Sequence, residues 1–278
     1  MTKKRSYIKD YSGFNWIGFY TLYLKETKRF LNVGTQTLIA PAITTLLFYG
    51  IFSIALGRND LKVNSINFTE FLAPGLICMA ILQNSFANTS SSILISKVQG
   101  NIVDILMPPL SYAELTLAFA LGGITRGLLV GIIVGLTIYF FVPMKLHSIN
   151  FIIFYSFSSA LFLSLLGVFC GVWSQKFDHM AAITNFIITP LTFLSGTFYS
   201  ISKLPDTWQY LAIFNPFFYM IDGFRYGFLG INDGSLNIGI IFLLIGNISS
   251  ILLCMYIFKN GYRLRNWNKR EYYKFITL

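Results

Sequence analysis

The chain has 278 residues, of which 55% are hydrophobic and 12% are charged, and its mean hydropathy is +0.62. A soluble fold of this size cannot bury so much apolar surface, which excludes an ordinary soluble protein and predicts an integral membrane protein. The formal net charge of +10 is compatible with a nucleic-acid partner. In so apolar a chain we instead expect the cations to face anionic lipid headgroups and set the orientation, with no nucleic acid bound.

Residues 13–31 combine aromatic side chains at helical spacing with basic side chains close behind them. The residues concerned are Trp16, Phe19, Tyr20, Tyr23, Lys25, Lys28 and Arg29. This pattern predicts an amphipathic interfacial helix on the cytoplasmic membrane surface, with its cations turned toward anionic lipid or a partner. An over-long first span is the alternative.

Six segments are long and apolar enough to cross a hydrocarbon core of about 30 Å, which takes roughly 20 residues per helix. They are 36–56, 70–95, 112–142, 150–174, 181–199 and 236–258. The predicted fold is therefore all-α, a single membrane domain over residues 1–278 with six transmembrane helices. Seven Lys or Arg residues precede position 30 and six follow position 258. This distribution predicts that both termini are cytoplasmic.

The second span turns polar toward its cytoplasmic half. We expect Gln83 and Asn88 to line a hydrophilic route and most of the other polar side chains to pack between helices. The loop after this span, residues 96–110, contains a short apolar stripe and ends in two prolines, which stop a helix before the third span begins.

The third span has a glycine at every fourth position, so one of its faces can approach another helix closely. These glycines are Gly123, Gly127, Gly131 and Gly135. The spacing leaves open whether the contact is within the subunit or between subunits. Arg126 lies near mid-span, where a charge is costly and indicates a function or an interior partner. The alternative is that Arg126 snorkels or caps a carbonyl cluster.

Residues 200–230 are apolar but interrupted by two prolines, each of which removes a backbone donor and clashes with the preceding turn. We expect a re-entrant pair of short helices that turns back near Asn215. A seventh span from Trp208 to Leu229 would carry the basic tail outside and is rejected. Asp222 and Arg225 are spaced to pair on one helix face, or else mark the aqueous rim. The predicted outer gate consists of Gly196, Phe198, Tyr199, Pro205, Asn215, Pro216, Asp222 and Arg225.

Two stretches carry a family resemblance. Residues 96–135 contain an Asn-x-x-Asp element from Asn101, a Pro-x-Ser element from Pro109 and an Arg-Gly pair at Arg126, and residues 190–233 end in the run from Phe224 to Asp233. In these motifs the chain resembles the permease subunits of type-2 ABC transporters, and it is similar in particular to the YadH-like bacterial inner-membrane permeases. One departure is Ser200, where many relatives have proline.

The resemblance implies a six-span half-transporter of the bacterial inner membrane that forms a homodimer and exports its cargo between the two subunits. It implies a separate cytoplasmic ATPase subunit that holds ATP and Mg, so no cofactor is expected on this chain. It also implies that the 96–110 loop contains the coupling helix, with a plain connector as the alternative. The expected coupling residues are Gln99, Asn101, Ile102, Asp104, Ile105 and Leu106.

Residues suited to catalysis or metal binding are scarce. The sequence has no phosphate-loop motif, its two histidines lie near span ends, and its three cysteines are isolated. We therefore expect no catalytic, cofactor-binding or metal-binding residue. The alternative function is an ion-coupled secondary transporter, which ordinarily needs acids at mid-membrane, whereas Glu70, Glu114 and Asp222 all lie near span ends. A membrane enzyme of lipid metabolism is a third class, for which no convincing acid–base pair is present.

Overall fold

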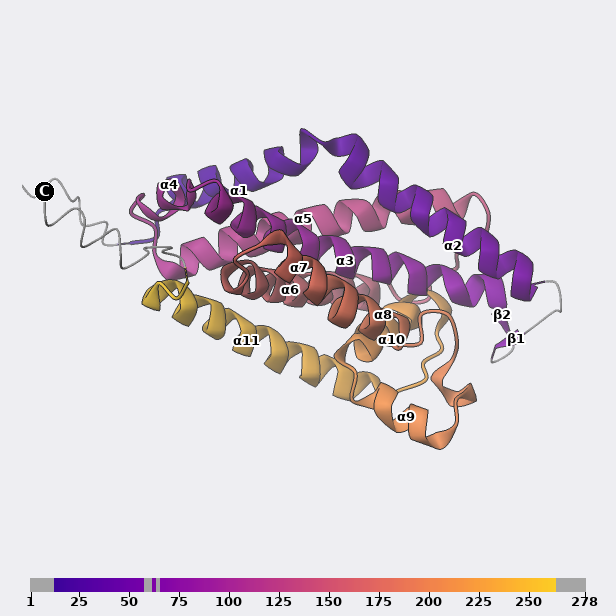
Figure 1. The fold of residues 1–278 in the computed structure, drawn as a ribbon. Coiled ribbons are helices and arrows are strands. Elements are labelled where there is room, and N and C mark those ends of the chain that lie inside the picture. Colours follow the sequence, from indigo (N-terminus) through magenta and orange to yellow (C-terminus); the bar gives the residue numbers. More distant parts are fainter. Residues whose placement is uncertain (1–12, 58–61, 64–65, 264–278) are drawn as a thin grey trace, which may run out of the picture.

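The computed structural model describes residues 13–57, 62–63 and 66–263, and these form a helical bundle with one small hairpin (Figure 1). The first elements are α1 (Trp16–Leu31), the π-helix η1 (Thr35–Ile39), α2 (Ala40–Gly57), the antiparallel strands β1 (Lys62–Val63) and β2 (Ile66–Asn67), α3 (Phe68–Val98) and α4 (Ile102–Leu106). The later ones are α5 (Tyr112–Tyr139), α6 (Ile149–Trp173), α7 (Phe177–Ile183), η2 (Thr184–Ile188), α8 (Thr189–Phe193), η3 (Ile201–Lys203), α9 (Asp206–Ile213), α10 (Pro216–Leu229) and α11 (Leu236–Asn260).

Five helical segments within the described residues are long and apolar enough to cross a membrane: Thr35–Ala55, α3, α5, α6 and α11. Each coincides with a predicted span to within a few residues. The predicted span 181–199 falls on α7, η2 and α8, which follow one another without a break and end at Phe193. That run is roughly 25 Å long at about 1.5 Å per residue, shorter than a hydrocarbon core of about 30 Å. The count of six spans therefore stays a prediction.

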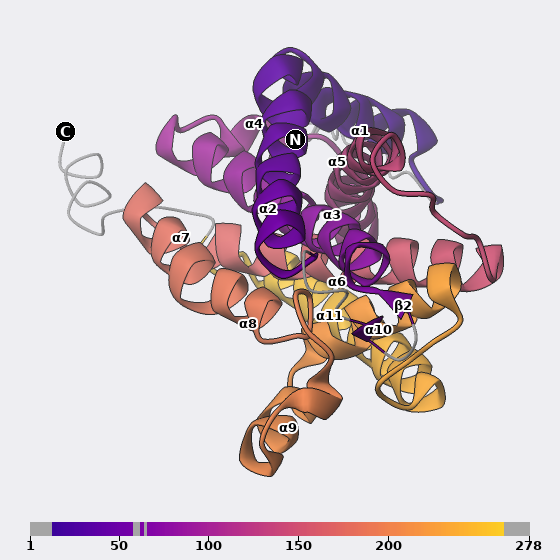
Figure 2. The ribbon, with the colours of Figure 1, turned by 90° about the vertical axis from the view of Figure 1, so that its right-hand side faces the viewer.

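Helix α3 is the centre of the bundle, and in the view along the bundle α2, α5 and α6 lie around it, with α11 beyond α6 (Figure 2). In its most apolar stretch 83% of the residues are buried, against 17% for Thr35–Ala55 and 22% for α11. Yet α3 has the lowest mean hydropathy of these five segments, 1.2. Its polar side chains are therefore turned toward neighbouring helices, where they can form interhelical hydrogen bonds.

The glycine row of α5 packs against helices of the same subunit. A Cβ atom at Gly123 would overlap the Ser164 hydroxyl, one at Gly127 would overlap the Ser85 hydroxyl, and one at Gly131 would lie 2.5 Å from Cγ1 of Ile81. The close contact is thus with α3 and α6 at three of the four positions. Gly135 takes no part in it, because its nearest neighbour, Cδ1 of Ile77, is 3.7 Å away.

Different helices and strands lie at the two ends of the bundle (Figure 1). Helices α1 and α4 and the last turn of α11 lie at one end, which we call the α4 end. The β-hairpin and α9 lie at the other, which we call the α9 end. The cations that predict the orientation fall largely in residues 1–12 and 264–278, which lie outside the described residues.

Candidate functional site

Helix α4 has a buried face and an exposed face. Ile102 and Ile105 are each 6% exposed and pack into the subunit's own core. Val103 and Met107 are 48% and 76% exposed, and Asp104 is also on the surface. The predicted apolar stripe therefore holds α4 on the bundle, because that is where its side chains leave water, and it does not form a docking surface. Of the other predicted coupling residues, Gln99 and Asn101 are exposed and Leu106 is half-buried.

Glu114 joins the start of α5 to the start of α1 at the α4 end, next to the connection between α4 and α5. It is 2% exposed, its Oε2 accepts a hydrogen bond from the Ser111 amide at 2.7 Å, and its own amide donates to the Ser111 hydroxyl, which completes a capping box at the start of α5. Its Oε1 accepts from the Asn15 amide just before α1, at 2.7 Å, and the Asn15 side-chain amide donates to the Pro109 carbonyl at 3.2 Å. The connection between α4 and α5 is therefore tied to the residue before α1 and to the first turn of α5.

Lys97 fastens the same end of α3 to α6. Its Nζ donates to the carbonyl oxygens of Val172 and Ser174, at 2.5 and 2.6 Å, and to that of Gly171 at 3.4 Å. These carbonyls lie at the C-terminal end of α6, where they have no hydrogen-bond partner within the helix. A cation at this end also interacts favourably with the helix dipole.

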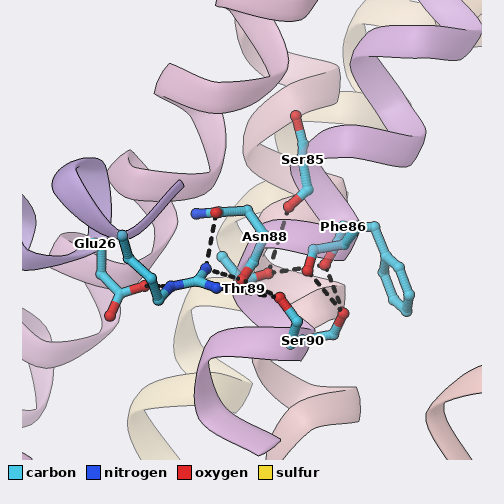
Figure 3. Close-up of polar contacts among 9 residues, drawn as sticks. Glu26, Ser85, Phe86, Asn88, Thr89 and Ser90 are labelled. Carbon is cyan, nitrogen blue, oxygen red and sulfur yellow. Dashed lines mark hydrogen bonds and ion pairs between the residues drawn. The ribbon is translucent and has the colours of Figure 1, made fainter. Parts of the chain in front are cut away.

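A polar cluster lies inside the bundle between α1, α3 and α5. Glu26 is fully buried, and its Oε2 lies 3.4 Å from Nε of Arg29. Nη2 of Arg29 donates to the side-chain and main-chain oxygens of Asn88, at 2.8 and 2.7 Å, and Nη1 approaches the Ser91 hydroxyl at 3.4 Å. Figure 3 shows Glu26 and Asn88, the two side chains that bind this guanidinium group. The sequence pattern predicts that Arg29 turns toward anionic lipid or a partner, but Glu26 and Asn88 of the same subunit bind its guanidinium group, and 27% of its side chain is exposed.

Arg126 occupies the middle of α5, beside the same face of α3. Its Nη2 donates to Oδ1 of Asn84 at 3.2 Å, and Asn84 in turn donates to the Ala80 carbonyl. Within the described residues no carboxylate pairs with Arg126, and its Nε has no hydrogen-bond partner. We call Glu26, Arg29, Asn84, Asn88 and Arg126 the two-arginine cluster.

The polar face of α3 is only partly accessible. Asn88 is fully buried and bound to Arg29, so in this subunit it does not line an open route, contrary to the prediction. Gln83 is partly exposed and lies 3.5 Å from the Thr192 hydroxyl near the end of α8. A partly exposed stripe runs along α3 at four-residue spacing: Gln83, Ala87, Ser91 and Ile95.

At the α9 end, two short helices meet at Asn215. Its Oδ1 accepts from the Phe217 amide at 3.0 Å and so caps α10, in which Pro216 is the first residue. Its side-chain amide donates to the Leu191 carbonyl of α8 at 2.7 Å. Helix α9, preceded by Pro205, is largely exposed, whereas α10 is largely buried. That this pair of helices re-enters a membrane stays a prediction.

Asp222 and Arg225 neither pair with each other nor mark an aqueous rim. They are 3% and 2% exposed, and each binds a different loop. Asp222 accepts from the amides of Asp233 and Gly234, at 2.9 and 3.0 Å, whereas Nη2 of Arg225 donates to the Gly196 carbonyl at 2.6 Å. The Arg225 guanidinium also lies 3.8 Å from the centre of the Phe71 ring. The two side chains therefore form no direct ion pair and lie away from the aqueous surface, because each binds the backbone of a different loop.

The remaining gate residues build the loop that follows α8. Gly196 has φ +75°, a left-handed conformation that favours glycine. Phe198 stacks on Phe193, with ring centres 5.1 Å apart, and Tyr199 is half-buried. The Ser200 hydroxyl donates to Oδ1 of Asp233 at 2.8 Å, so serine at this position ties the loop to the segment before α11.

Sequence reasoning missed two residues that organise these sites. Glu26 stands in a run of basic residues, and nothing in the sequence marks it as buried. Glu114 was treated only as an acid near a span end. The signal that could have found its role is the spacing from Ser111, because serine followed three residues later by glutamate is the pattern of a capping box.

Comparison with known proteins gives a consistent answer. Residues 18–229 match the model of the ABC-2 type transporter family. The chain is 38% identical over 251 residues to the inner membrane transport permease YadH of Escherichia coli (strain K12), a match that covers 90% of this chain and 98% of that protein. It is 24% identical over 244 residues to nodulation protein J of Rhizobium leguminosarum bv. viciae, covering 82% of this chain and 88% of that protein.

Proposed function

The chain belongs to the ABC-2 type transporter family and is a membrane permease subunit of an ABC transporter, and on that premise we propose that it forms the transmembrane half of an ATP-driven exporter. The family implies a partner ATPase subunit, and permease subunits of this family are generally not enzymes. In this proposal ATP and Mg bind to the partner, and hydrolysis takes place there. Family membership also decides against an ion-coupled secondary transporter.

The coupling proposal rests on the way α4 packs on the bundle, with one face buried and the other exposed. Its exposed face, with Asp104 and Met107, is available to a partner, while its buried face is fixed in the core. Glu114 links the α4–α5 connection to α1 and α5 through charge-assisted hydrogen bonds. We propose that closure of the ATPase pushes on the exposed face and that these links carry the displacement into the bundle.

The proposed transporter contains two copies of this chain, with the cargo path between them. The segment Thr35–Ala55 supports this proposal, because it is the least buried of the five long apolar segments and has room for a partner on its outer face. The run from α7 to α8 is also exposed, with Phe186 81% exposed. We propose that this run is the fifth of six crossings, that surrounding lipid covers the remaining apolar faces, and that α9 and α10 form a re-entrant gate.

The homologue and the apolar helices make this a multi-pass inner membrane protein. We propose that the α4 end and both termini are cytoplasmic. Cysteine labelling tests the orientation with Met107→Cys and Leu146→Cys, since these residues are 76% and 66% exposed near opposite ends. The native cysteines Cys78, Cys170 and Cys254 are buried and give little background. An impermeant maleimide should label Leu146→Cys in intact spheroplasts and Met107→Cys only after permeabilisation, and the reverse pattern would contradict the topology.

The coupling proposal is tested by co-purification with the ATPase subunit and by the rate of ATP hydrolysis of the complex. Asp104→Arg reverses an exposed charge on α4, and its matched control, Lys145→Glu, reverses an exposed charge between α5 and α6. A like-charge contact or lost ion pair at an interface costs about 2 kcal/mol or more, so we expect Asp104→Arg to weaken the complex at least about tenfold. Unchanged co-purification and hydrolysis in both Asp104→Arg and Val103→Asp would refute α4 as the coupling site.

A further inference from the structure

The two-arginine cluster has an excess of positive charge. Glu26 is its only carboxylate among the described residues, and it lies beside Arg29. Arg126 has the neutral Asn84 as its partner. Two guanidinium groups and one carboxylate leave one uncompensated positive charge near the middle of α5, where an unpaired charge is costly and indicates a missing partner.

The cluster also has unused hydrogen-bond donors. Nε of Arg126 and the side-chain amide nitrogen of Asn88 are buried and form no hydrogen bond, whereas Nε of Arg29 faces Oε2 of Glu26 at 3.4 Å in the ion pair. The carboxylate oxygens of Glu26 form none either, although Oε2 stands in the ion pair with Arg29. Asn88 is fully buried, so water at the protein surface does not satisfy its free donor. Buried donors without acceptors beside an excess cation suit an oxyanion, which supplies both acceptors and negative charge.

The cluster can be reached from outside the subunit. The Arg29 side chain is 27% exposed, and Ser91, which it approaches, belongs to the partly exposed stripe of α3. Asn88 lies ten residues before Val98, so the cluster is roughly 15 Å along α3 from its α4 end. A ligand that reaches this depth within a membrane protein needs an apolar part to remain favourable there.

Arg225, which is buried, has a different environment from the partly exposed Arg126. Arg225 donates to the Gly196 carbonyl, lies on the Phe71 ring, and has Asp222 one turn earlier on its own helix without a direct ion pair. Its Nε, like that of Arg126, forms no hydrogen bond. Arg126 has neither an aromatic face nor an acid beside it. The unpartnered Nε is therefore common to both arginines, and the difference between them is the aromatic ring and the nearby acid that Arg225 has and Arg126 lacks.

We propose that the two-arginine cluster binds the oxyanion headgroup, such as a phosphate, of an acidic amphiphile. The inference rests on the proposed function, since it makes this headgroup the part of the cargo that the subunit holds during transport. Guanidinium groups bind phosphate and carboxylate through paired N–H donors, and they do so strongly where water is excluded. The same chemistry also admits an anionic lipid of the surrounding bilayer, so the experiment separates these two sources.

The test measures equilibrium binding of radiolabelled hexadecyl phosphate to the purified full-length chain in a neutral maltoside detergent. Arg126→Gln removes the charge, Arg126→Lys keeps it, and the double change Lys25→Gln with Lys28→Gln removes exposed cations of α1 outside the cluster. We expect Arg126→Gln to raise the Kd for hexadecyl phosphate at least about tenfold, because a charge-assisted hydrogen bond is lost. Arg126→Lys and the double change at Lys25 and Lys28 should raise it less. Arg29→Gln should weaken binding similarly, and gel filtration with thermal melting shows whether each variant is folded.

Equal affinity of wild type and a folded Arg126→Gln for hexadecyl phosphate would overturn the proposal. So would equal affinity of the wild type for hexadecyltrimethylammonium. The two sources are separated in nanodiscs that contain phosphatidylglycerol. If phosphatidylglycerol displaces hexadecyl phosphate, the site is supported and its occupant is a lipid of the bilayer. If hexadecyl phosphate still binds, the site is supported and its occupant is the cargo. No ATPase takes part, so a negative result leaves the coupling proposal intact, and a failed Asp104→Arg test leaves this site intact.

Discussion

Replacing Gly127 by alanine should destabilise the bundle, whereas the same change at Gly135 should not. The two glycines belong to one row on α5 and differ in what a Cβ atom would meet. At Gly127 it would overlap the Ser85 hydroxyl and lie 3.0 Å from the Ile81 carbonyl oxygen and 3.1 Å from the Ser85 Cβ. At Gly135 the nearest atom is 3.7 Å away. Both substitutions change helix propensity equally, so their difference measures packing alone.

The size of the effect follows from these contacts. Overpacking a tight interface costs about 1–3 kcal/mol, and alanine returns up to about 1 kcal/mol of helix propensity. The net loss at Gly127→Ala is therefore on the order of 1–2 kcal/mol, with a gain or no change at Gly135→Ala. Adding Ser85→Ala to Gly127→Ala removes the overlapping hydroxyl but leaves the carbonyl contact, so it should restore part of the loss.

The assay is reversible unfolding of the full-length chain in mixed micelles, with SDS as denaturant and circular dichroism as the signal. Gly127→Ala should unfold at a lower SDS fraction than wild type, Gly135→Ala at the same or a higher one, and the double variant between Gly127→Ala and wild type. Equal stability of the two glycine variants would refute the close packing of α5 on α3 at this position.

Three further changes test the links at the two ends of the bundle. Glu114→Gln should weaken the hydrogen bonds from the Asn15 and Ser111 amides by about 1.5–3 kcal/mol and speed hydrogen exchange of these amides about tenfold or more. The control variant Glu70→Gln should leave the exchange of both amides unchanged. Asp222→Asn should speed hydrogen exchange at the 233 and 234 amides, with Asp206→Asn as the exposed control. Protection equal to wild type would disprove the hydrogen bonds from these amides to Asp222. Asn215→Ala should cost about 1 kcal/mol through loss of the α10 cap, and an unchanged unfolding midpoint would contradict it.

The sequence by itself determined the class of protein, the helices and most of their ends. Length and hydropathy are enough to place a membrane helix, because a chain without water must satisfy its backbone hydrogen bonds locally. The same local rules located the two short helices that meet at Asn215, since a proline interrupts and an Asn-Pro pair restarts a helix.

Only the tertiary structure decided which face of each helix meets which neighbour. Periodicity marks a face but carries no information about its partner, and lipid does not distinguish one apolar face from another. For that reason Ile102 and Ile105 turned inward, and the glycine row packed within the subunit. Arg29, which pairs with Glu26 three residues away, was also bound to Asn88, 59 positions away along the chain, and no local pattern in the sequence encodes that second contact.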